Sequence, residues 1–393
     1  MPNQAFIIDC VRTPMGRGKP GGSLSNLHAT DVLAPVLRAL VERNDLDPGA
    51  VDDIIAGCVS QAGEQSAGVG RFAWLGAGYP DHVPSTTIDR KCGSSQQAVH
   101  FAAQGIMAGA YDIVIACGVE SMSRVPMGSA RIGQNPFSPS VLERYAPGMI
   151  GQGVSAELVA HKWNITRDEL DAYSAGSHQR AAAAQAAGAF DSEIIPVQTP
   201  AGLVSRDETI RASTTADGLA QLKIAFASDA MKARYPQLDW RVTAGNSSQI
   251  TDGAAGLLIM SERMAVKLGL KPRARFAGFD VIGDDPLMML TAPIPATRRV
   301  LEKTGMKISE IEHFEVNEAF ASVPLAWQRE FRVDAARLNP LGGAIALGHP
   351  LGASGARLMT TMLNAMEQSG ARYGLQTMCE AGGMANATII ERG

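Results

Sequence analysis

The sequence has few cysteines, and those it has are not placed for cross-linking. Five occur among 393 residues, at positions 10, 58, 92, 117 and 379, and no two form a Cys-x-x-Cys pair. An odd and scattered set argues against a disulfide framework or a zinc site and favours a reducing compartment. We therefore expect a cytoplasmic protein without a bound metal.

Long apolar runs and a strong excess of one charge are also lacking. No run approaches the ~20 residues needed to cross a bilayer, and the first residues lead into a strand pattern rather than a signal peptide. The net charge of −4 gives no basic footprint for nucleic acid. We expect no membrane partner and no nucleic-acid partner.

The sequence is rich in apolar residues, and they occur in segments that alternate between strand and helix patterns. At 46% hydrophobic content, 393 residues can bury a large core and more than one domain. Residues 5–11, 53–59 and 112–117 have the pattern of buried strands, and residues 30–41 have helical spacing. Strands alternating with helices predict an α/β protein with a largely parallel sheet covered on both faces.

The C-terminal part of the chain repeats the N-terminal part. Residues 311–317 match residues 51–57, and residues 373–379 match residues 111–117. Between these segments, Cys92 and His349 each precede a helical run. The pattern predicts a duplicated βα unit in which the two equivalent helix N-termini, with Cys92 and His349, meet near a common axis.

Residues 122–248 differ in character from both copies. They are rich in loops and in Lys and Arg, and Thr166 and Glu169 form a capping-box pattern that opens an alanine-rich helix ending near Gly188. We predict an inserted subdomain that grips a phosphate-bearing ligand. The predicted division is residues 1–121 with 249–272, then 122–248, then 273–393.

Cys92 lies where a short strand pattern meets a helix. Unpaired N–H groups and the positive end of the helix dipole at such a junction favour a thiolate. By itself, the position also fits an ordinary buried cysteine. Cys379, in an apolar strand pattern, and His349, after a glycine, each allow the same two interpretations.

Four stretches occur together: Cys92-Gly-Ser-Ser, Asn317-Glu-Ala-Phe, the run Gly-Gly-Ala-Ile-Ala-Leu-Gly-His-Pro-Leu-Gly around His349, and Cys379-Glu-Ala-Gly-Gly. With them the chain resembles the thiolase family over essentially its whole length. The resemblance implies the thiolase fold, with duplicated halves in a layered αβαβα core and an inserted loop subdomain over the active site.

The resemblance also implies a reaction: reversible CoA-dependent cleavage of a 3-ketoacyl-CoA through an acyl-cysteine intermediate. Cys92 would be the nucleophile, His349 the acceptor of its proton, and Cys379 the second acid and base. One oxyanion hole would combine His349 with a water held by Asn317. The other would use the backbone N–H groups of Cys92 and Ala381. CoA is then a co-substrate, and no cofactor is permanently bound.

For the CoA substrate, the resemblance implies contacts from Ala244 and Ser248, in the loop at residues 243–248, and from Lys223 and Gln152. Lys223 stands where relatives often have an arginine near the adenine and phosphates. Gly151-Gln152 stands where short-chain biosynthetic thiolases carry His-Met near the acyl end, which favours a bulkier substrate. The family further implies a homodimer or homotetramer.

One departure from the family pattern is Ala381, where relatives usually have glycine. An alanine retains the N–H group, but its Cβ would narrow or reshape the second oxyanion hole, and it is penalised if the position needs a positive φ. We interpret Glu318 and His100 as structural residues, and Cys10, Cys58 and Cys117 as core.

Three alternative functions remain open at this stage. They are a biosynthetic acetoacetyl-CoA thiolase, a decarboxylating condensing enzyme, and a non-catalytic acyl-CoA or sterol-CoA binding protein. Cys379 argues against the second, and the intact Cys92, His349 and Asn317 argue against the third. We expect degradation of fatty acids or of steroid side chains or rings, and the sequence does not distinguish between these substrates.

Overall fold

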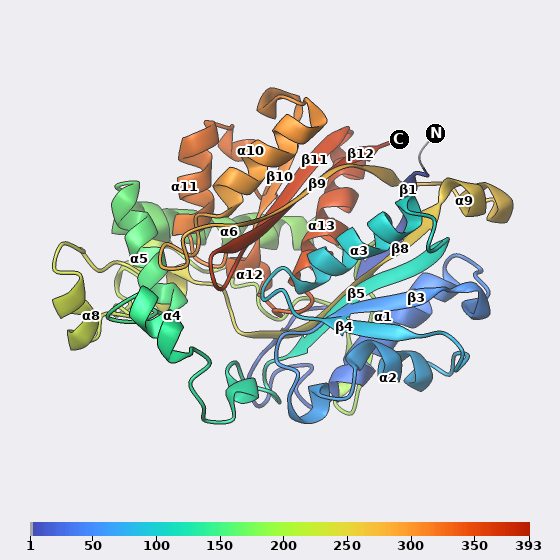
Figure 1. The fold of residues 1–393 in the computed structure, drawn as a ribbon, viewed down its shortest axis with the longest axis horizontal. Coiled ribbons are helices and arrows are strands. Elements are labelled where there is room, and N and C mark those ends of the chain that lie inside the picture. The colour runs from blue at the N-terminus through green and yellow to red at the C-terminus, as the bar shows by residue number, and fades with distance from the viewer. Residues whose placement is uncertain (1–2) are drawn as a thin grey trace.

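The computed structural model describes residues 3–393, in which one large β-sheet carries helices on its faces (Figure 1). The strands of this sheet are β1 (Ala5–Arg12), β2 (Gly16–Arg17), β3 (Asp53–Gly57), β4 (Ser85–Ile88), β5 (Ile113–Ser121), β8 (Thr251–Ser261), β9 (Ala274–Gly283), β10 (His313–Val316), β11 (Tyr373–Glu380) and β12 (Met384–Arg392). Their order is β10-β11-β12-β9-β1-β8-β5-β3-β4, and β2 pairs with β8.

The sheet is mixed, so the prediction of a largely parallel sheet is wrong. Within the described range, only the pairs β3–β4, β3–β5 and β10–β11 are parallel, and the others are antiparallel. The β11–β12 pair is a hairpin with a three-residue turn, and a hairpin can join only antiparallel strands. Gly382 (φ +94°) and Gly383 (φ +78°) supply the left-handed conformations of that turn.

Two halves of this sheet follow the same pairing scheme, which confirms the predicted duplication. In one half β3 pairs with β5 in parallel, and β5–β8 and β8–β1 are antiparallel. In the other, β10 pairs with β11 in parallel, and β11–β12 and β12–β9 are antiparallel. The short antiparallel contact of β1 with β9, at Phe6 and Ile7, joins the halves.

The two halves of the sheet form two β layers, and helices form the other three layers. The layering helices are α1 (Ala29–Glu42), α2 (Val69–Gly76), α3 (Ser94–Met107), α10 (Pro293–Thr304), α11 (Ser322–Phe331) and α13 (Ser354–Ser369). The helices α3 and α13 pack on each other and on strands of the sheet, including β5 and β8. The pair α1 and α2 covers the first half, and α10 covers the second with α11 beside it, as Figure 1 shows. The αβαβα core is therefore present.

The middle layer depends on close backbone approach between α3 and α13. Ala356 N–H donates to Oγ of Ser95 at 2.9 Å, and a Cβ on Gly355 would lie 2.2 Å from the backbone nitrogen of Gln96. The first turns of the two helices thus approach so closely that only the small side chain of Ser95 bridges them and no side chain fits at position 355. This contact brings together the segments that carry Cys92 and His349, as the duplication predicts.

Residues 122–248 contribute no strand to the main sheet. Their described elements are α4 (Pro139–Arg144), α5 (Gln152–Lys162), α6 (Arg167–Ala186), α7 (Ala216–Ala220), α8 (Asp229–Arg234) and the hairpin β6 (Val197–Thr199) with β7 (Gly202–Val204). The predicted capping box is present, because Thr166 N–H donates to the Glu169 carboxylate at 2.7 Å and Glu169 N–H donates to Oγ1 of Thr166 at 3.2 Å. Helices α4, α5 and α8 lie at the left of Figure 1, away from the β4 edge.

Two short helices remain, α9 (Glu262–Leu268) after β8 and α12 (Ala344–Leu347) before His349. None of the helices described in residues 3–393 combines the length and the apolar character needed to cross a bilayer.

Candidate active site

Cys92 is presented by a tight turn just before α3. Lys91 has φ +49°, which is uncommon for a residue with a side chain. Its N–H donates to the Asp89 carboxylate at 2.7 Å. Ser94 closes the turn, because its Oγ accepts from Arg90 N–H at 2.9 Å and donates to the Lys91 carbonyl at 2.6 Å. The strained turn is therefore held on both sides of the cysteine.

The thiol of Cys92 points into a small apolar cluster. The side chain is 4% exposed, and its cluster consists of Met122, Leu351, Leu358 and Met378, with Val59 packed against it. Three polar groups also reach the sulfur and lower the pKa of the thiol: the backbone N–H of Cys92 itself, the backbone N–H of Ala381, and the side-chain amide of Gln152, the first residue of α5. The insertion thus contributes directly to the surroundings of Cys92.

Despite these donors, the resting thiol is protonated. Burial, followed by the nearby Glu380, raises the pKa of Cys92 to about 12. The prediction that the helix junction would favour a thiolate is therefore wrong for the resting site. Desolvation of the sulfur outweighs the N–H groups around it.

His349 is buried as a neutral base. Burial, followed by the charge of Arg357, lowers the pKa of its imidazole to about 3. Nδ1 lies 2.6 Å from Oγ of Ser354, whose own proton goes to the Pro350 carbonyl at 2.8 Å. We therefore assign the proton of the ring to Nδ1, which leaves the lone pair on Nε2.

The free nitrogen of His349 faces Asn317. Nδ2 of Asn317 lies 3.5 Å from Nε2 of His349, and Oδ1 of Asn317 is buried without a hydrogen-bond partner in the described residues. The backbone of His349 is fixed separately, because its N–H donates to Oγ1 of Thr251 at 3.0 Å. No direct hydrogen bond joins Cys92 to His349 in residues 3–393. Their segments meet through the cluster contact of Cys92 with Leu351 and the contact between α3 and α13.

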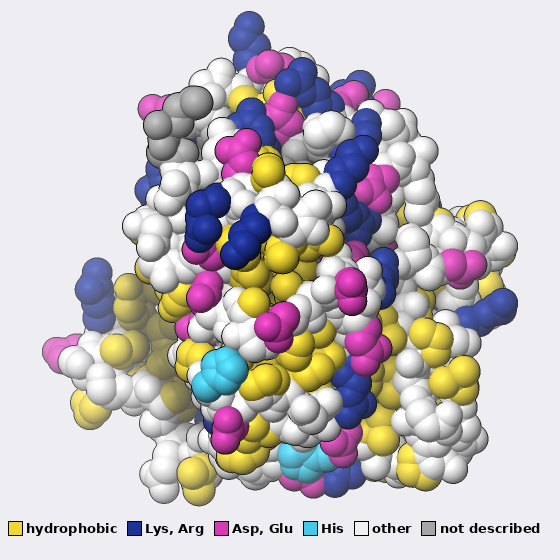
Figure 2. All heavy atoms as spheres, turned by 90° about the vertical axis from the view of Figure 1, so that its right-hand side faces the viewer, with side chains coloured by type: hydrophobic (Ala, Val, Ile, Leu, Met, Phe, Trp, Pro, Cys, Tyr) yellow, Lys and Arg dark blue, Asp and Glu magenta, His cyan; other side chains and the backbone are white. Residues whose placement is uncertain are grey.

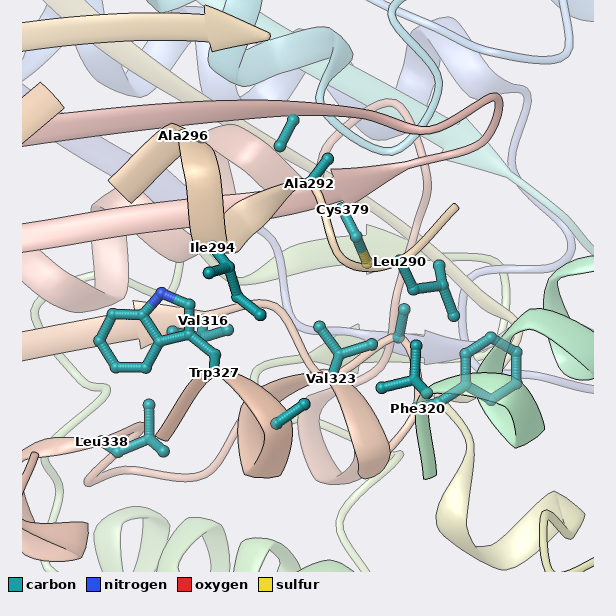
Figure 3. Packing of buried hydrophobic residues seen from close by; sticks show 14 of the residues in the cluster. Leu290, Ala292, Ile294, Ala296, Val316, Phe320, Val323, Trp327, Leu338 and Cys379 are labelled. Atoms are coloured by element: carbon teal, nitrogen blue, oxygen red, sulfur yellow. The ribbon is translucent and has the colours of Figure 1, made fainter. Parts of the chain in front are cut away.

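Cys379 is the second thiol near this point. It lies near the end of β11 in the apolar cluster of Figure 3, in which its side chain is drawn close to that of Leu290. Burial raises the pKa of the Cys379 thiol well above its usual range, and a negative charge on Cys92 or on Glu380 would raise it further. The two sulfur atoms are therefore within electrostatic reach of each other.

Ala381 follows β11 at the start of the hairpin turn. It is half-buried, and it is not among the residues of positive φ, which in this turn are Gly382 and Gly383. An alanine at this position therefore carries no left-handed penalty.

The four residues predicted to contact CoA fall into two places. Ile224 and Thr243 form an antiparallel bridge, which places the segment of Lys223 beside that of Ala244. Lys223 and Ala244 are both exposed. Ser248 lies beside the segment of Asn317, because its N–H donates to the Ala319 carbonyl at 2.9 Å, two residues after Asn317. Gln152 lies against Cys92 instead.

The residues interpreted as structural are buried and bonded. The Glu318 carboxylate accepts four hydrogen bonds, from Tyr173, Ser177, Asn339 and the N–H of Ile345. His100 bonds to Thr388 at 2.7 Å, and Cys10, Cys58 and Cys117 are buried.

Two residues of this site escaped the sequence analysis: Ser354 and Glu380. Ser354 follows His349 by five residues in the same motif. The only sign in the sequence that its side chain would reach the imidazole is that a helix begins there and turns the chain back toward His349. Glu380 stands between two singled-out residues, but nothing in the sequence shows which way it points. In residues 3–393, no group of three or more His, Cys, Asp or Glu side chains is arranged to hold a metal ion.

Comparison with known proteins assigns the chain to a family. The N-terminal domain of thiolases matches residues 5–263, and the C-terminal domain of thiolases matches residues 270–392. The chain belongs to the thiolase family. Thiolases are acyltransferases, so this chain is an enzyme of that class.

Individual thiolases resemble this one along their full length. It is 48% identical to "Steroid 3-ketoacyl-CoA thiolase FadA6" of Mycobacterium tuberculosis, over 99% of this chain and 94% of that protein. It is 44% identical to a 3-ketoacyl-CoA thiolase of Cronobacter sakazakii, over 99% of both. Among solved structures, the acetyl-CoA acetyltransferase of Bacillus anthracis matches with a TM-score of 0.88 and 35% identity, covering 100% of this chain and 99% of that one.

Proposed function

We propose that this thiolase cleaves 3-ketoacyl-CoA with CoA, giving acetyl-CoA and an acyl-CoA shortened by two carbons, through an acyl group carried on Cys92. The observation that carries the proposal is that two thiols, Cys92 and Cys379, lie within electrostatic reach of each other, with the N–H of Ala381 on the Cys92 sulfur and the neutral base His349 in the adjoining segment. A neutral imidazole in the adjoining segment can accept the proton that the Cys92 thiol releases as its sulfur attacks.

The first half-reaction uses all three groups. The Cys92 sulfur attacks the ketone carbon while its proton passes to Nε2 of His349. The bond between the α and β carbons then breaks, and its electron pair forms the enolate of acetyl-CoA. The Cys379 thiol, kept protonated by burial, gives its proton to that enolate.

The second half-reaction restores the enzyme. The Cys379 thiolate removes the proton of the incoming CoA thiol, whose sulfur attacks the thioester on Cys92. The tetrahedral intermediate expels the Cys92 sulfur, and this sulfur recovers its proton from His349. Acyl-CoA leaves, and both cysteines and the histidine are in their starting states.

Two oxyanions develop during this cycle, and two groups of donors suit them. The backbone N–H groups of Cys92 and Ala381 both act on the Cys92 sulfur, so an oxygen on the carbon bound to that sulfur would be within their reach. The second site would use His349 with Asn317, whose unpartnered Oδ1 could hold a water. Removing one such donor typically raises the barrier by about 3 kcal/mol.

For CoA, we propose a site on residues 122–248. In the proposed division of the chain, this segment is a subdomain of its own, one half consists of residues 1–121 with 249–272, and the other half consists of residues 273–393. The absence of main-sheet strands in residues 122–248 of the described chain supports this division. Lys223 is exposed and forms no ion pair in the described residues, so it is available to a phosphate. Ala244 and Ser248 would contact the pantetheine arm that leads to the thiols.

The proposed substrates are 3-ketoacyl-CoAs longer than acetoacetyl-CoA, in degradation. The relatives at 48% and 44% identity are named for 3-ketoacyl-CoA, one of them for steroid substrates. The acetyl-CoA acetyltransferase structure, at 35% identity, keeps acetoacetyl-CoA as the second candidate.

The test is the CoA-dependent loss of enolate absorbance from 3-ketoacyl-CoAs with short, long and ring-bearing acyl groups. We expect turnover of the larger substrates, and its loss in Cys92→Ala. A preference for acetoacetyl-CoA would favour the biosynthetic alternative. Turnover that persists in Cys92→Ala would contradict the mechanism.

We also propose a homodimeric or homotetrameric, cytoplasmic enzyme. In Figure 2, apolar side chains gather in the middle of the face that forms the right-hand side of Figure 1. Large apolar side chains are exposed on the neighbouring helices α2 and α3, including Phe72 (50%) and Phe101 (43%). Apolar surface of this kind marks an interaction site. The five unbridged cysteines agree with a reducing compartment.

A further inference from the structure

Glu380 is a buried carboxyl group beside both reactive cysteines, and the mechanism above does not use it. It is the last residue of β11, between Cys379 and Ala381. Its side chain is fully buried, and neither carboxyl oxygen has a hydrogen-bond partner in the described part of the chain. A group of this kind is costly to keep unless it serves a purpose.

The carboxyl group lies directly against the turn that presents the nucleophile. Alternate residues of a strand share a face, so Glu380 points to the same side as Met378, which packs in the cluster of Cys92. A Cβ on Gly93 would lie 1.9 Å from Oε1 of Glu380. The carboxyl therefore fills the space that a side chain next to Cys92 would need, which explains why position 93 is a glycine.

Four ionisable groups surround Glu380: Arg90 and Asp89 in the segment before α3, Cys92, and Cys379 on its own strand. On β12, only the backbone of Asn386 acts on it. A buried carboxylate without a bonded counter-ion is far less stable than the uncharged acid. Burial accordingly raises the pKa of Glu380 well above its usual range, although Arg90 opposes the effect.

We propose that Glu380 is a positioning residue for Cys92: an uncharged carboxylic acid that packs under Gly93. While Glu380 keeps its proton, a thiolate can form on Cys92. Once Glu380 loses its proton, its negative charge suppresses that thiolate. The inference rests on the proposed role of Cys92. The physical reason is repulsion, because an ionised carboxylate at Glu380 disfavours a negative charge on the Cys92 sulfur and so raises the pKa of that thiol.

The experiment measures alkylation of Cys92 by iodoacetamide in the full-length enzyme from about pH 6 to about pH 10, a range that spans ordinary thiol ionisation. Peptide mass spectrometry distinguishes Cys92 from the other four cysteines. Glu380→Gln keeps the shape but cannot ionise, whereas Glu380→Asp restores an ionisable group. Glu315→Gln is the matched control, because Glu315 is a buried carboxyl on β10 that also has an unpartnered oxygen.

At the acid end of this range, where the proposal has Glu380 protonated, we expect wild type and Glu380→Gln to react at rates within about twofold of each other. Near pH 9 to 10 the Gln variant should react about tenfold faster, because a like charge at this range shifts a neighbouring titration by about one unit or more. Glu380→Asp should return to the wild-type profile, and Glu315→Gln should match wild type throughout.

A constant ratio of rates at every pH, including a ratio of one, would overturn the proposal, because a purely structural contact does not titrate. If Glu380→Gln does not fold, the wild-type profile decides: a rise in rate that flattens as Glu380 ionises supports the proposal, and a single-step rise refutes it. Turnover by Cys92→Ala would refute the role of the nucleophile and leave this alkylation result interpretable by itself.

Discussion

Replacing Ser354 by alanine tests how the imidazole of His349 is held. Oγ of Ser354 lies 2.6 Å from Nδ1 and donates its own proton to Pro350. In Ser354→Ala, the Nδ1 proton faces a buried space without an acceptor, which costs about 1–3 kcal/mol. The tautomer with its proton on Nε2 avoids this cost, but it cannot accept a proton from Cys92.

The magnitude follows from that competition. If restoring the productive tautomer takes about 1–2 kcal/mol, the barrier rises by the same amount and kcat falls about 5- to 30-fold. KM for CoA should change little, because the proposed CoA contacts lie in residues 223–248. Steady-state thiolysis measures both constants.

Ser369→Ala is the control for this prediction, because Ser369 ends the same helix and its Oγ bonds only with backbone groups there: it donates to the Ala365 and Met366 carbonyls and accepts from Ala371 N–H. It should leave kcat unchanged. A wild-type kcat in a folded Ser354→Ala enzyme would refute the assignment of the proton to Nδ1.

Three further predictions concern stability and specificity. Burial lowers the pKa of His100 to about 3, so between about pH 6.5 and pH 3 only the unfolded state binds a proton at this residue, and stability falls as the pH drops. In His100→Gln, the plot of unfolding free energy in urea against pH should be flatter on its acid side, by up to about 1.4 kcal/mol per pH unit. An unchanged slope would contradict this. Ala381→Gly should lose about 0.5–1 kcal/mol, since no left-handed strain is relieved, and should alter relative turnover across acyl lengths if the Cβ shapes the oxyanion hole; a gain in stability would show strain. Glu318→Ala should lose at least about 3 kcal/mol in chemical unfolding because four buried donors lose their acceptor, and a loss below about 1 kcal/mol would show that those donors find other partners.

The sequence predicts which segments meet, because that information is local and repeated. The matching patterns before Cys92 and His349 predict equivalent helices, and the contact from Ala356 to Ser95 follows from their packing in one layer. Strand direction was mispredicted because apolar patterning reports burial and not direction. The glycines at 382 and 383 did carry a hairpin signal that the alternation of strands and helices obscured.

The ionisation of Cys92 could not be predicted in the same way. The helix terminus and the N–H of Ala381 act in the predicted direction, but the pKa of the thiol is decided by burial and by Glu380. Both are products of the tertiary packing of β11 against the turn before α3. Gln152 likewise reaches the sulfur from a different part of the chain.

The most direct test of the account is to find where an acyl group is held. The enzyme is mixed with acetyl-CoA labelled in its acetyl group, quenched in acid and digested, and the label is located by mass spectrometry. The account predicts label on the peptide of Cys92, still present in Cys379→Ala and absent in Cys92→Ala. Label on Cys379, or no covalent label on a fully active enzyme, would contradict it.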